Sequence, residues 1–310
     1  MKVFVAGASG AIGRPLVRQL VAAGHEVTGT TRREERAAEI RAAGAKAAVC
    51  DALDAAALRE AVVEAAPEVV VHQLTALPTR LELKGDFLEP TNRLRTEGTR
   101  NLLEAARASG TRLLVAHSVA FLYAPEGDWV KDERAPMFEQ APGPFAGAVR
   151  ALADLERQVT SAEHVEGVVL RYGWFYGPGT HFAPDGAQAE EARRRRLPIV
   201  GKGTGTYSFI HVEDAASATV AALERGAPGV YNVTDDEPAS MREWVPAYAE
   251  AIGAKKPLHA PKWVARLVAG SAAAMMATQL RGASNAKARR ELGWRPRYPS
   301  WRQGFREALG

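Results

Sequence analysis

The sequence predicts an α/β fold of the Rossmann type: a doubly wound parallel sheet with a smaller C-terminal substrate lobe. Two observations predict it. Short apolar segments alternate with helical segments through residues 1–173, and a glycine-rich turn joins the first strand to the first helix. Apolar strands separated by helices are typical of a parallel sheet that is covered on both faces. Right-handed crossovers make such a sheet doubly wound.

The individual elements follow from apolar runs for strands and from apolar residues at helical spacing for helices. We expect strands at residues 2–7, 26–31, 46–51, 67–74, 111–118 and 165–173. We expect helices at residues 11–24, 33–44, 54–65, 96–110 and 144–163. Asp54 is the expected N-cap of the third helix, because its short side chain can accept hydrogen bonds from free backbone N–H groups.

The alternation loosens after residue 173, which suggests a division of the chain. Residues 1–173 are assigned to a dinucleotide-binding domain and residues 174–310 mostly to a substrate-binding lobe. Residues 206–235 again contain a strand, a helix and a strand, so we expect them to return to the sheet. The lobe is therefore expected to be interleaved with the sheet.

Composition excludes several classes of protein. The formal net charge of +4 gives no case for nucleic acid, and no uncharged apolar run is long enough for a membrane span. Cys50 is the only cysteine, and the chain begins without a signal-peptide pattern, so we expect a cytoplasmic protein. No histidines pair at metal-ligand spacing and no cysteines cluster, so no metal is expected.

A glycine-rich turn, "GASGAIG", places Gly7, Gly10 and Gly13 between the first strand and the first helix. Gly7 permits a tight turn, Gly10 lets the backbone approach a pyrophosphate, and Gly13 allows the helix to pack closely. The free N–H groups at the helix N-terminus then face the phosphates. This context predicts a dinucleotide site.

Further motifs occur in order along nearly the whole chain. They are "VVVHQLTAL", "EGTRNLLEAAR", "LLVAHSVAFLY", "VVLRYGWFYGPG", "FIHVEDAASATVAAL" and "NAKARRELGWRPRY". With the Gly-x-x-Gly-x-x-Gly spacing, the chain resembles an extended short-chain dehydrogenase/reductase of the NAD-dependent epimerase/dehydratase family. The resemblance implies a Rossmann fold, a nicotinamide cofactor and a small-molecule substrate. It also allows a homodimer through the helices that follow the fourth and fifth strands.

The resemblance implies contacts to each part of the cofactor. Asp51 resembles the family residue that meets the adenine amino group, and Tyr172 and Gly173 resemble the pair near the carboxamide. The other implied cofactor residues lie in or beside these motifs: Gly7, Ser9, Gly10, Ala11, Ile12, Gly13, Ala52, Leu53, Leu74, Thr75, Ala76 and Arg95.

The end of the second strand favours NADP(H) over NAD(H). An NAD enzyme places a carboxylate there to accept hydrogen bonds from the ribose hydroxyls. Here Thr31 stands where the family's Asp usually falls, and Arg32 and Arg33 follow. A hydroxyl and cations suit a 2′-phosphate. The alternative is that the arginines only begin a solvated helix.

The usual acid and its lysine are missing. The family pairs a Ser or Thr after the fifth strand with a Tyr-x-x-x-Lys helix, and Ser118 falls at the hydroxyl position. If Glu156 is the glutamate that follows the family's lysine, the Tyr and Lys positions hold Ala148 and Leu152. A shift of two residues gives Ala146 and Arg150 instead.

Another side chain could supply the acid. Tyr123 lies on the loop after Ser118, and we predict Ser118 and Tyr123 as the catalytic pair. Tyr176, His117 and His181 lie near the same edge but fit structural roles at least as well. A second departure is Arg95, three residues before Gly98, where the family usually has Asn.

The helix expected at residues 144–163 carries a stripe of apolar residues. Val149, Leu152, Leu155 and Val159 recur at helical spacing, and the stripe could serve the core or a dimer interface.

Three hypotheses for function follow. The first is an atypical NADP(H)-dependent oxidoreductase that acts on a carbonyl, enone or alcohol without the Tyr/Lys relay. The second is a nucleotide-sugar epimerase or dehydratase, which would need a base that the sequence does not offer. The third is a catalytically silent NADP(H)-binding regulator.

Overall fold

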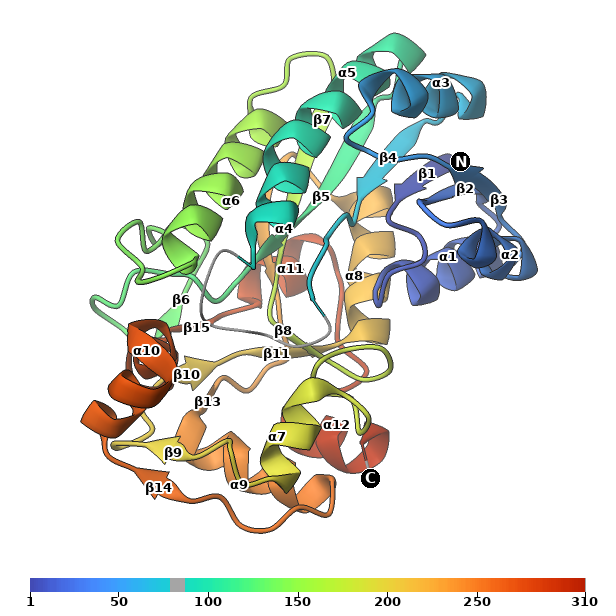
Figure 1. Ribbon diagram of the computed structural model, residues 1–310. Helices are drawn as coiled ribbons and strands as arrows, with labels where there is room; N and C mark the ends of the chain where they lie inside the picture. Colours follow the sequence, from blue (N-terminus) through green and yellow to red (C-terminus); the bar gives the residue numbers. More distant parts are fainter. Residues whose placement is uncertain (79–86, 310) are drawn as a thin grey trace.

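A seven-stranded parallel sheet forms the centre of the molecule (Figure 1). The computed structural model describes residues 1–78 and 87–309. The strands, in their order across the sheet, are β12 (Gly229–Val233), β7 (Glu166–Tyr172), β5 (Leu113–Val119), β4 (Val69–His72), β1 (Lys2–Ala6), β2 (Glu26–Thr31) and β3 (Lys46–Val49). Every neighbouring pair is parallel. The chain reverses its direction of winding between β1 and β4, which is where such sheets bind ligands.

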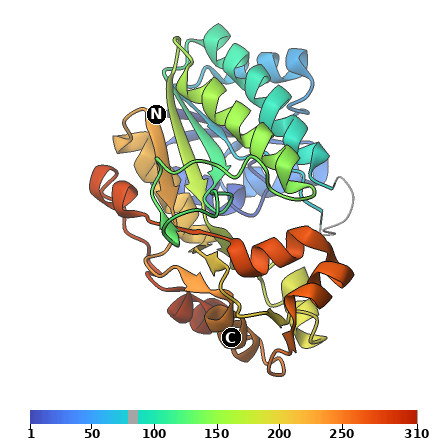
Figure 2. The same cartoon turned by 90° about the vertical axis from the view of Figure 1, so that its left-hand side faces the viewer.

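Helices cover both faces of this sheet (Figures 1 and 2). One face is covered by α1 (Gly13–Ala22), α2 (Glu34–Ala42), α8 (Val212–Arg225) and α11 (Ala286–Glu291). The other is covered by α3 (Ala55–Ala65), α5 (Thr99–Ser109) and α6 (Phe145–Thr160). The two apolar layers bury the inner strands from both sides, whereas β3 at the edge has no buried residue. This arrangement confirms the predicted Rossmann-type sheet.

Two helix beginnings illustrate how local sequence sets the elements. The Asp54 side chain accepts hydrogen bonds from the N–H groups of Ala56 and Ala57, both at 3.1 Å, and so caps α3 as predicted. The helix expected from residue 96 begins earlier. It starts as α4 (Glu89–Arg93), passes through the π-helical turn η1 (Leu94–Gly98) and continues as α5.

The smaller lobe is built mainly from the last third of the chain (Figure 2). Its helices are α7 (Ala187–Arg193), α9 (Met241–Ala251), α10 (Lys262–Gln279) and α12 (Trp301–Ala308). Its strands form two-stranded pairs: β8 (Trp174–Tyr176) with β11 (Phe209–His211), β9 (Ile199–Val200) with β14 (His259–Ala260), and β10 (Thr206–Tyr207) with β13 (Ala239–Ser240). A last pair joins β15 (Gly282–Ala283) to β6 (Val130–Lys131). Within residues 206–235, β12 is a strand of the central sheet and α8 packs on one face of it, whereas β10 and β11 belong to the lobe.

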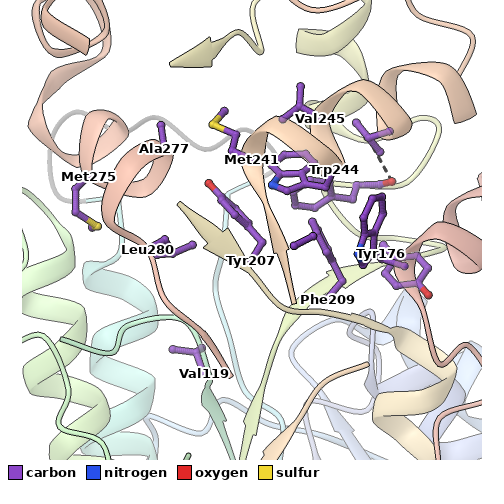
Figure 3. Packing of buried hydrophobic residues seen from close by; sticks show 14 of the residues in the cluster. Val119, Tyr176, Tyr207, Phe209, Met241, Trp244, Val245, Met275, Ala277 and Leu280 are labelled. Atoms are coloured by element: carbon purple, nitrogen blue, oxygen red, sulfur yellow. Dashed lines mark hydrogen bonds between the residues drawn. The ribbon is translucent and has the colours of Figure 1, made fainter. Parts of the chain in front are cut away.

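An apolar cluster connects the lobe to the sheet. Tyr207, Phe209 and Trp244 are buried in the lobe, and their rings lie 4.9–6.0 Å apart between centroids. Val119, at the end of β5, belongs to the same cluster as Leu280 (Figure 3). The end of β5 is therefore covered by the lobe.

Helix α10 lies at the edge of the lobe and carries exposed apolar side chains. Trp263, Leu267 and Val268 are each more than two-thirds exposed, and the helix is interrupted at Gly270, whose φ is +86°. Within residues 1–78 and 87–309, the structure contains no helix with the length and apolarity that crossing a bilayer requires.

We predict that Asp54→Ala lowers the free energy of unfolding by about 1 kcal/mol, because two N–H groups lose their acceptor. Urea denaturation measures this change. Asp128→Ala, at an exposed position away from any helix start, serves as the control and should leave the unfolding midpoint unchanged. Equal effects of the two substitutions would contradict the capping role.

Candidate functional site

The glycine loop has the shape that a dinucleotide requires. Gly7 has a φ of +91°, and a Cβ there would lie 2.7 Å from the carbonyl oxygen of Gln73. A Cβ on Gly13 would overlap the Gly7 carbonyl and the Ala8 backbone, so only glycine lets α1 start this close to β1. Helix α1 begins without a side-chain cap, and the Gly10 backbone is exposed. The Arg14 N–H already donates to the Gly10 carbonyl at 3.1 Å and Pro15 has no N–H, so the N–H groups that face a pyrophosphate would be those of Ala11, Ile12 and Gly13.

Three arginines surround the end of β2. Arg32 and Arg33 are exposed directly after Thr31. Sequence reasoning missed a third: the Arg36 guanidinium donates to the Ser9 carbonyl at 3.1 Å and so lies over the glycine loop. The Ser9 hydroxyl donates to Thr31 Oγ1 at 3.2 Å, which ties this loop to the strand end. The signal was present, because Arg36 follows Arg32 and Arg33 by one helical turn.

The residues predicted for the adenine and ribose contacts follow β3 and β4. Asp51 accepts from the Leu53 N–H at 3.0 Å and stays partly exposed, next to buried Ala52. After β4, Thr75 is exposed. Because the carboxyl ends of parallel strands meet at one edge, the structure brings these segments and the glycine loop together at that edge.

The remaining residues of the loop after β4 are held by hydrogen bonds. Leu74 donates its N–H to His72 Nδ1 at 3.2 Å, and Ala76 donates its own to Thr91 Oγ1 at 3.0 Å. Burial lowers the pKa of His72 to about 4, so this imidazole is neutral and can accept that bond. The loop is thus fixed beside the glycine turn.

Ser118 belongs to a buried polar network rather than to an open surface. Its side chain is fully buried, and the hydroxyl donates to Glu156 Oε1 at 2.6 Å. Arg171 donates to both oxygens of Glu156, at 2.8 and 2.6 Å. The pairing follows from sheet register, because Ser118 lies opposite Arg171 on the neighbouring strand. The Ser118 hydroxyl therefore already donates its proton in a hydrogen bond to the Glu156 carboxylate.

Tyr123 joins the same network from the other side. Its hydroxyl accepts from Arg171 at 3.0 Å and donates to Asn232 Oδ1 at 2.6 Å. Burial raises the pKa of Tyr123, although Arg171 acts against this shift. Burial alone would lower the pKa of Arg171, but hydrogen bonds to Glu156 and the charge beside it hold it above its usual value. In this arrangement neither predicted acid can donate to a substrate without breaking an internal bond.

Helix α6 presents apolar side chains to this region. Ala148 and Leu152, at the positions that the resemblance assigns to Tyr and Lys, are 1% and 0% exposed. Val149, Leu155 and Val159 are also fully buried, so the apolar stripe is packed into the core of this chain.

The end of β7 is aromatic. Phe121 and Trp174 stack with ring centroids 4.0 Å apart and planes 21° apart, and the buried Trp174 Nε1 has no hydrogen-bond partner in the described chain. Tyr172 is fully buried, and its hydroxyl is paired with Gln73 and Thr219 at 3.1 and 2.7 Å. Gly173 is buried, and a Cβ there would lie 2.5 Å from the carbonyl oxygen of Ser208. Tyr172 has no polar group left to offer a cofactor.

The three other aromatic and histidine side chains near this edge are packed into the protein. Tyr176 is fully buried and its ring lies against Phe305 of α12, with centroids 5.3 Å apart. His117 packs edge-on against Tyr172, and burial lowers its pKa to about 3. His181 hydrogen-bonds the Pro78 carbonyl at 3.0 Å. Within residues 1–78 and 87–309, no group of three or more His, Cys, Asp or Glu side chains is placed to hold a metal ion.

Comparison with known proteins identifies the family. Residues 3–234 match the NAD dependent epimerase/dehydratase family. The chain belongs to this family.

Relatives within the family include several reductases. The chain is 49% identical to a 3-diazoavenalumate denitrifying reductase of Streptomyces sp, over 98% of this chain and 99% of the relative. It is 30% identical to a 4-hydroxy-2-methyl-3-oxo-4-farnesyl-3,4-dihydroquinoline-1-oxide ketoreductase of Stigmatella aurantiaca, over 95% and 92%.

A solved structure is similar to this protein over the whole chain. The UDP-glucose 4-epimerase of Thermus thermophilus, in complex with NAD, matches with a TM-score of 0.75 and 26% identity, covering 100% of this chain and 98% of that one. Reductases and epimerases among the relatives support an enzyme of the oxidoreductase or epimerase kind. A nicotinamide dinucleotide is the cofactor class of the family.

We predict that Glu156→Gln lowers the free energy of unfolding by about 3–5 kcal/mol, because it leaves the buried Arg171 without its counter-charge. Chemical denaturation measures this loss. Glu97→Gln is the matched control, because Glu97 pairs with Arg93 at 2.9 Å on the surface and its loss should change stability little. Similar losses in the two variants would contradict the structural role of the buried pair.

Proposed function

We propose that this protein is an NADP(H)-dependent reductase whose substrate accepts a hydride without needing a proton from the enzyme. The observation that carries the proposal is the contrast between two walls of one site. The glycine loop keeps the features of a dinucleotide cradle, whereas α6 carries Ala148 and Leu152, both buried, at the positions that the resemblance assigns to the phenol and its lysine. Binding of cofactor is thus supported, while the family's usual proton donor has no counterpart on this helix.

A bound nicotinamide cofactor supplies hydride to an electrophilic carbon. Reduction of a carbonyl also consumes a proton: R₂C=O + NADPH + H⁺ gives R₂CHOH + NADP⁺. Reduction of a diazonium carbon does not: R–N₂⁺ + NADPH gives R–H + N₂ + NADP⁺, and the C–N electron pair leaves with N₂. The second reaction suits a site without an acid.

The Streptomyces relative supports this substrate class. It is 49% identical over nearly the full length of both chains and is named as a denitrifying reductase of a diazo compound. We therefore propose a diazo or diazonium compound as the substrate, in place of an ordinary ketone. A conjugated enone is a second electrophile that accepts hydride at carbon, with water as the proton source.

The chain's own residues would bind and orient this substrate. Phe121 and Trp174 stack at the end of β7, next to Tyr207 of the lobe, whose ring centroid is 5.5 Å from that of Trp174. An aromatic wall of this kind favours a planar, conjugated substrate. The unpartnered Trp174 Nε1 is a donor that an oxygen of the substrate could satisfy.

Ser118 and Tyr123 would have a structural role at the site, because both side chains are buried and hold α6 in place through hydrogen bonds. Their bonds to Glu156 and Arg171 fix α6 against β5 and β7. This keeps the apolar residues of α6 in place and excludes water from the reacting carbon. Exclusion of water matters because a diazonium carbon also reacts with water, which would compete with hydride.

A nucleotide-sugar epimerase is a less suitable assignment. Oxidation of a sugar hydroxyl requires a base. The Tyr123 hydroxyl already donates to Asn232 and its pKa is raised by burial, so it is a poor base.

We predict that the double variant Arg32→Ala/Arg33→Ala weakens NADPH binding by about 10²- to 10⁴-fold, because each of the two charge-assisted bonds to a 2′-phosphate contributes about 1.5–3 kcal/mol. Isothermal titration calorimetry measures the affinity. Binding of NADH, which lacks that phosphate, is the control and should change little. Equal losses for NADPH and NADH, or no loss for NADPH, would exclude the assignment of these arginines.

We predict that the enzyme reduces an aryl diazonium salt with kcat/KM at least about 10²-fold above that for the aryl ketone of the same skeleton. The margin reflects the contribution of a positioned general acid, which only the ketone needs. NADPH absorbance and evolved N₂ are followed together.

Two controls separate enzymatic reduction from direct reduction by NADPH. One omits the protein, and the other uses the Arg32→Ala/Arg33→Ala variant at low NADPH, which should slow only the enzymatic rate. Turnover of the ketone as fast as the diazonium salt, or no turnover of either, would overturn the proposal.

A further inference from the structure

Arg95 is a buried cation with no carboxylate partner in the part of the chain that the structure describes. Its residue is 8% exposed, and burial lowers its pKa to about 10, so the guanidinium is still charged at neutral pH. Among residues 1–78 and 87–309, its one side-chain partner is Asn92 Oδ1, at 3.2 Å. A guanidinium has five donors, and a buried charge without a counter-charge is costly to fold. The cost indicates that a ligand completes this group.

The backbone around Arg95 is held in an unusual conformation. Arg95 lies in the π-helical turn η1, and such turns frequently occur at functional sites. The Thr99 hydroxyl donates to the Arg95 carbonyl at 2.5 Å, and His72 Nε2 lies 3.1 Å from the same hydroxyl. His72 ends β4, so these bonds fix Arg95 beside the carboxyl end of that strand.

Arg95 also lies next to the helix that lacks the family's lysine. Its partner Asn92 places Nδ2 3.5 Å from where a Cβ on Gly147 would be. Gly147 precedes Ala148 in the first turns of α6, and η1 packs against α6. The guanidinium therefore lies near the turns of α6 that contain Ala148 and Leu152.

The order of the strands in the sheet indicates whether the adenosine half or the nicotinamide half of a dinucleotide would lie beside Arg95. The phosphates sit at the glycine loop after β1, and the ribose beside Thr31 lies over β2. The cofactor's other half then extends to the opposite side of β1, over β4 and β5. Arg95 is at the end of β4, so it is on the nicotinamide side.

We propose that Arg95 supplies, from the η1 turn, the cation that α6 lacks at Leu152, and that it binds the nicotinamide ribose and the phosphate next to it. The inference rests on cofactor binding as proposed above. It makes Arg95 a positioning residue, because it would hold the cofactor's reactive ring in place without exchanging a proton with the substrate. It also gives a physical reason for arginine where the family usually has asparagine. The positive charge that the family's lysine provides on α6 would here be provided by Arg95 on η1.

The test compares two probes that share only the adenosine half. NADPH contains the nicotinamide ribose, whereas 2′,5′-ADP does not. We expect Arg95→Met to weaken NADPH binding by about 10- to 100-fold and to leave 2′,5′-ADP binding unchanged in calorimetry. Arg95→Lys should retain most of the NADPH affinity, because it keeps the charge.

Two further variants make the result specific. Arg100→Met, an exposed arginine on the next turn, should bind both probes like the wild type. Adding Leu152→Lys to Arg95→Met should restore part of the NADPH affinity. In the absence of ligand, Arg95→Met should melt at the same or a higher temperature than the wild type, because it removes an unpaired buried charge.

The outcomes separate this inference from the proposed function. Unchanged NADPH affinity in Arg95→Met overturns the inference alone, and so does an equal loss for both probes. A fall in melting temperature of the ligand-free variant also overturns it, because Arg95 would then be structural. A rise in substrate KM at constant NADPH affinity would assign Arg95 to the substrate instead and overturn it as well. Wild-type protein that binds neither NADPH nor NADH overturns the proposed function and, with it, this inference.

Discussion

The buried pair of Glu156 and Arg171 is the interaction on which the site depends. It joins α6 to the end of β7 with two hydrogen bonds, and both side chains are at most 10% exposed. Ser118 donates a further hydrogen bond to Glu156, and Tyr123 accepts one from Arg171, so each charged group has an additional polar partner. A buried ion pair of this kind adds little net stability compared with apolar packing, but it is costly to break. It therefore fixes the orientation of α6 more than it strengthens the fold.

The orientation of α6 decides which of its side chains lie on the side of the sheet. With Glu156 turned toward the sheet, Leu152 and Ala148 follow on the same side at helical spacing, and both are buried. The helix thus packs apolar side chains into the core at the two positions that the resemblance assigns to a phenol and an amine. This arrangement is the basis for the proposed hydride transfer to carbon without a proton donor on α6. The charge on Arg95, beside this helix, is the group that we propose to hold the nicotinamide half of the dinucleotide.

Much of the fold could be predicted from sequence because its determinants are local. The apolar strands, the glycine turn and the Asp54 cap each depend on a few adjacent residues. The orientation of Ser118 could not, because side chains on a strand alternate between faces, and one residue decides whether a group meets Glu156 or the lobe. Val119, the next residue, joins the cluster under the lobe instead. The row that Ser118 forms with Arg171 and Asn232 depends on register across three strands, which no single segment encodes.

We propose that the chemical step moves a hydride and no proton, and the solvent isotope effect on that step is the decisive measurement. Single-turnover reduction of an aryl diazonium salt is followed in H₂O and in D₂O, with NADPH and with NADPH deuterated at C4. If only a hydride moves, the rate falls with the deuterated cofactor and is the same in the two solvents. A rate that falls in D₂O by as much as it falls with the deuterated cofactor would show that a proton moves in the same step, and would exclude this mechanism.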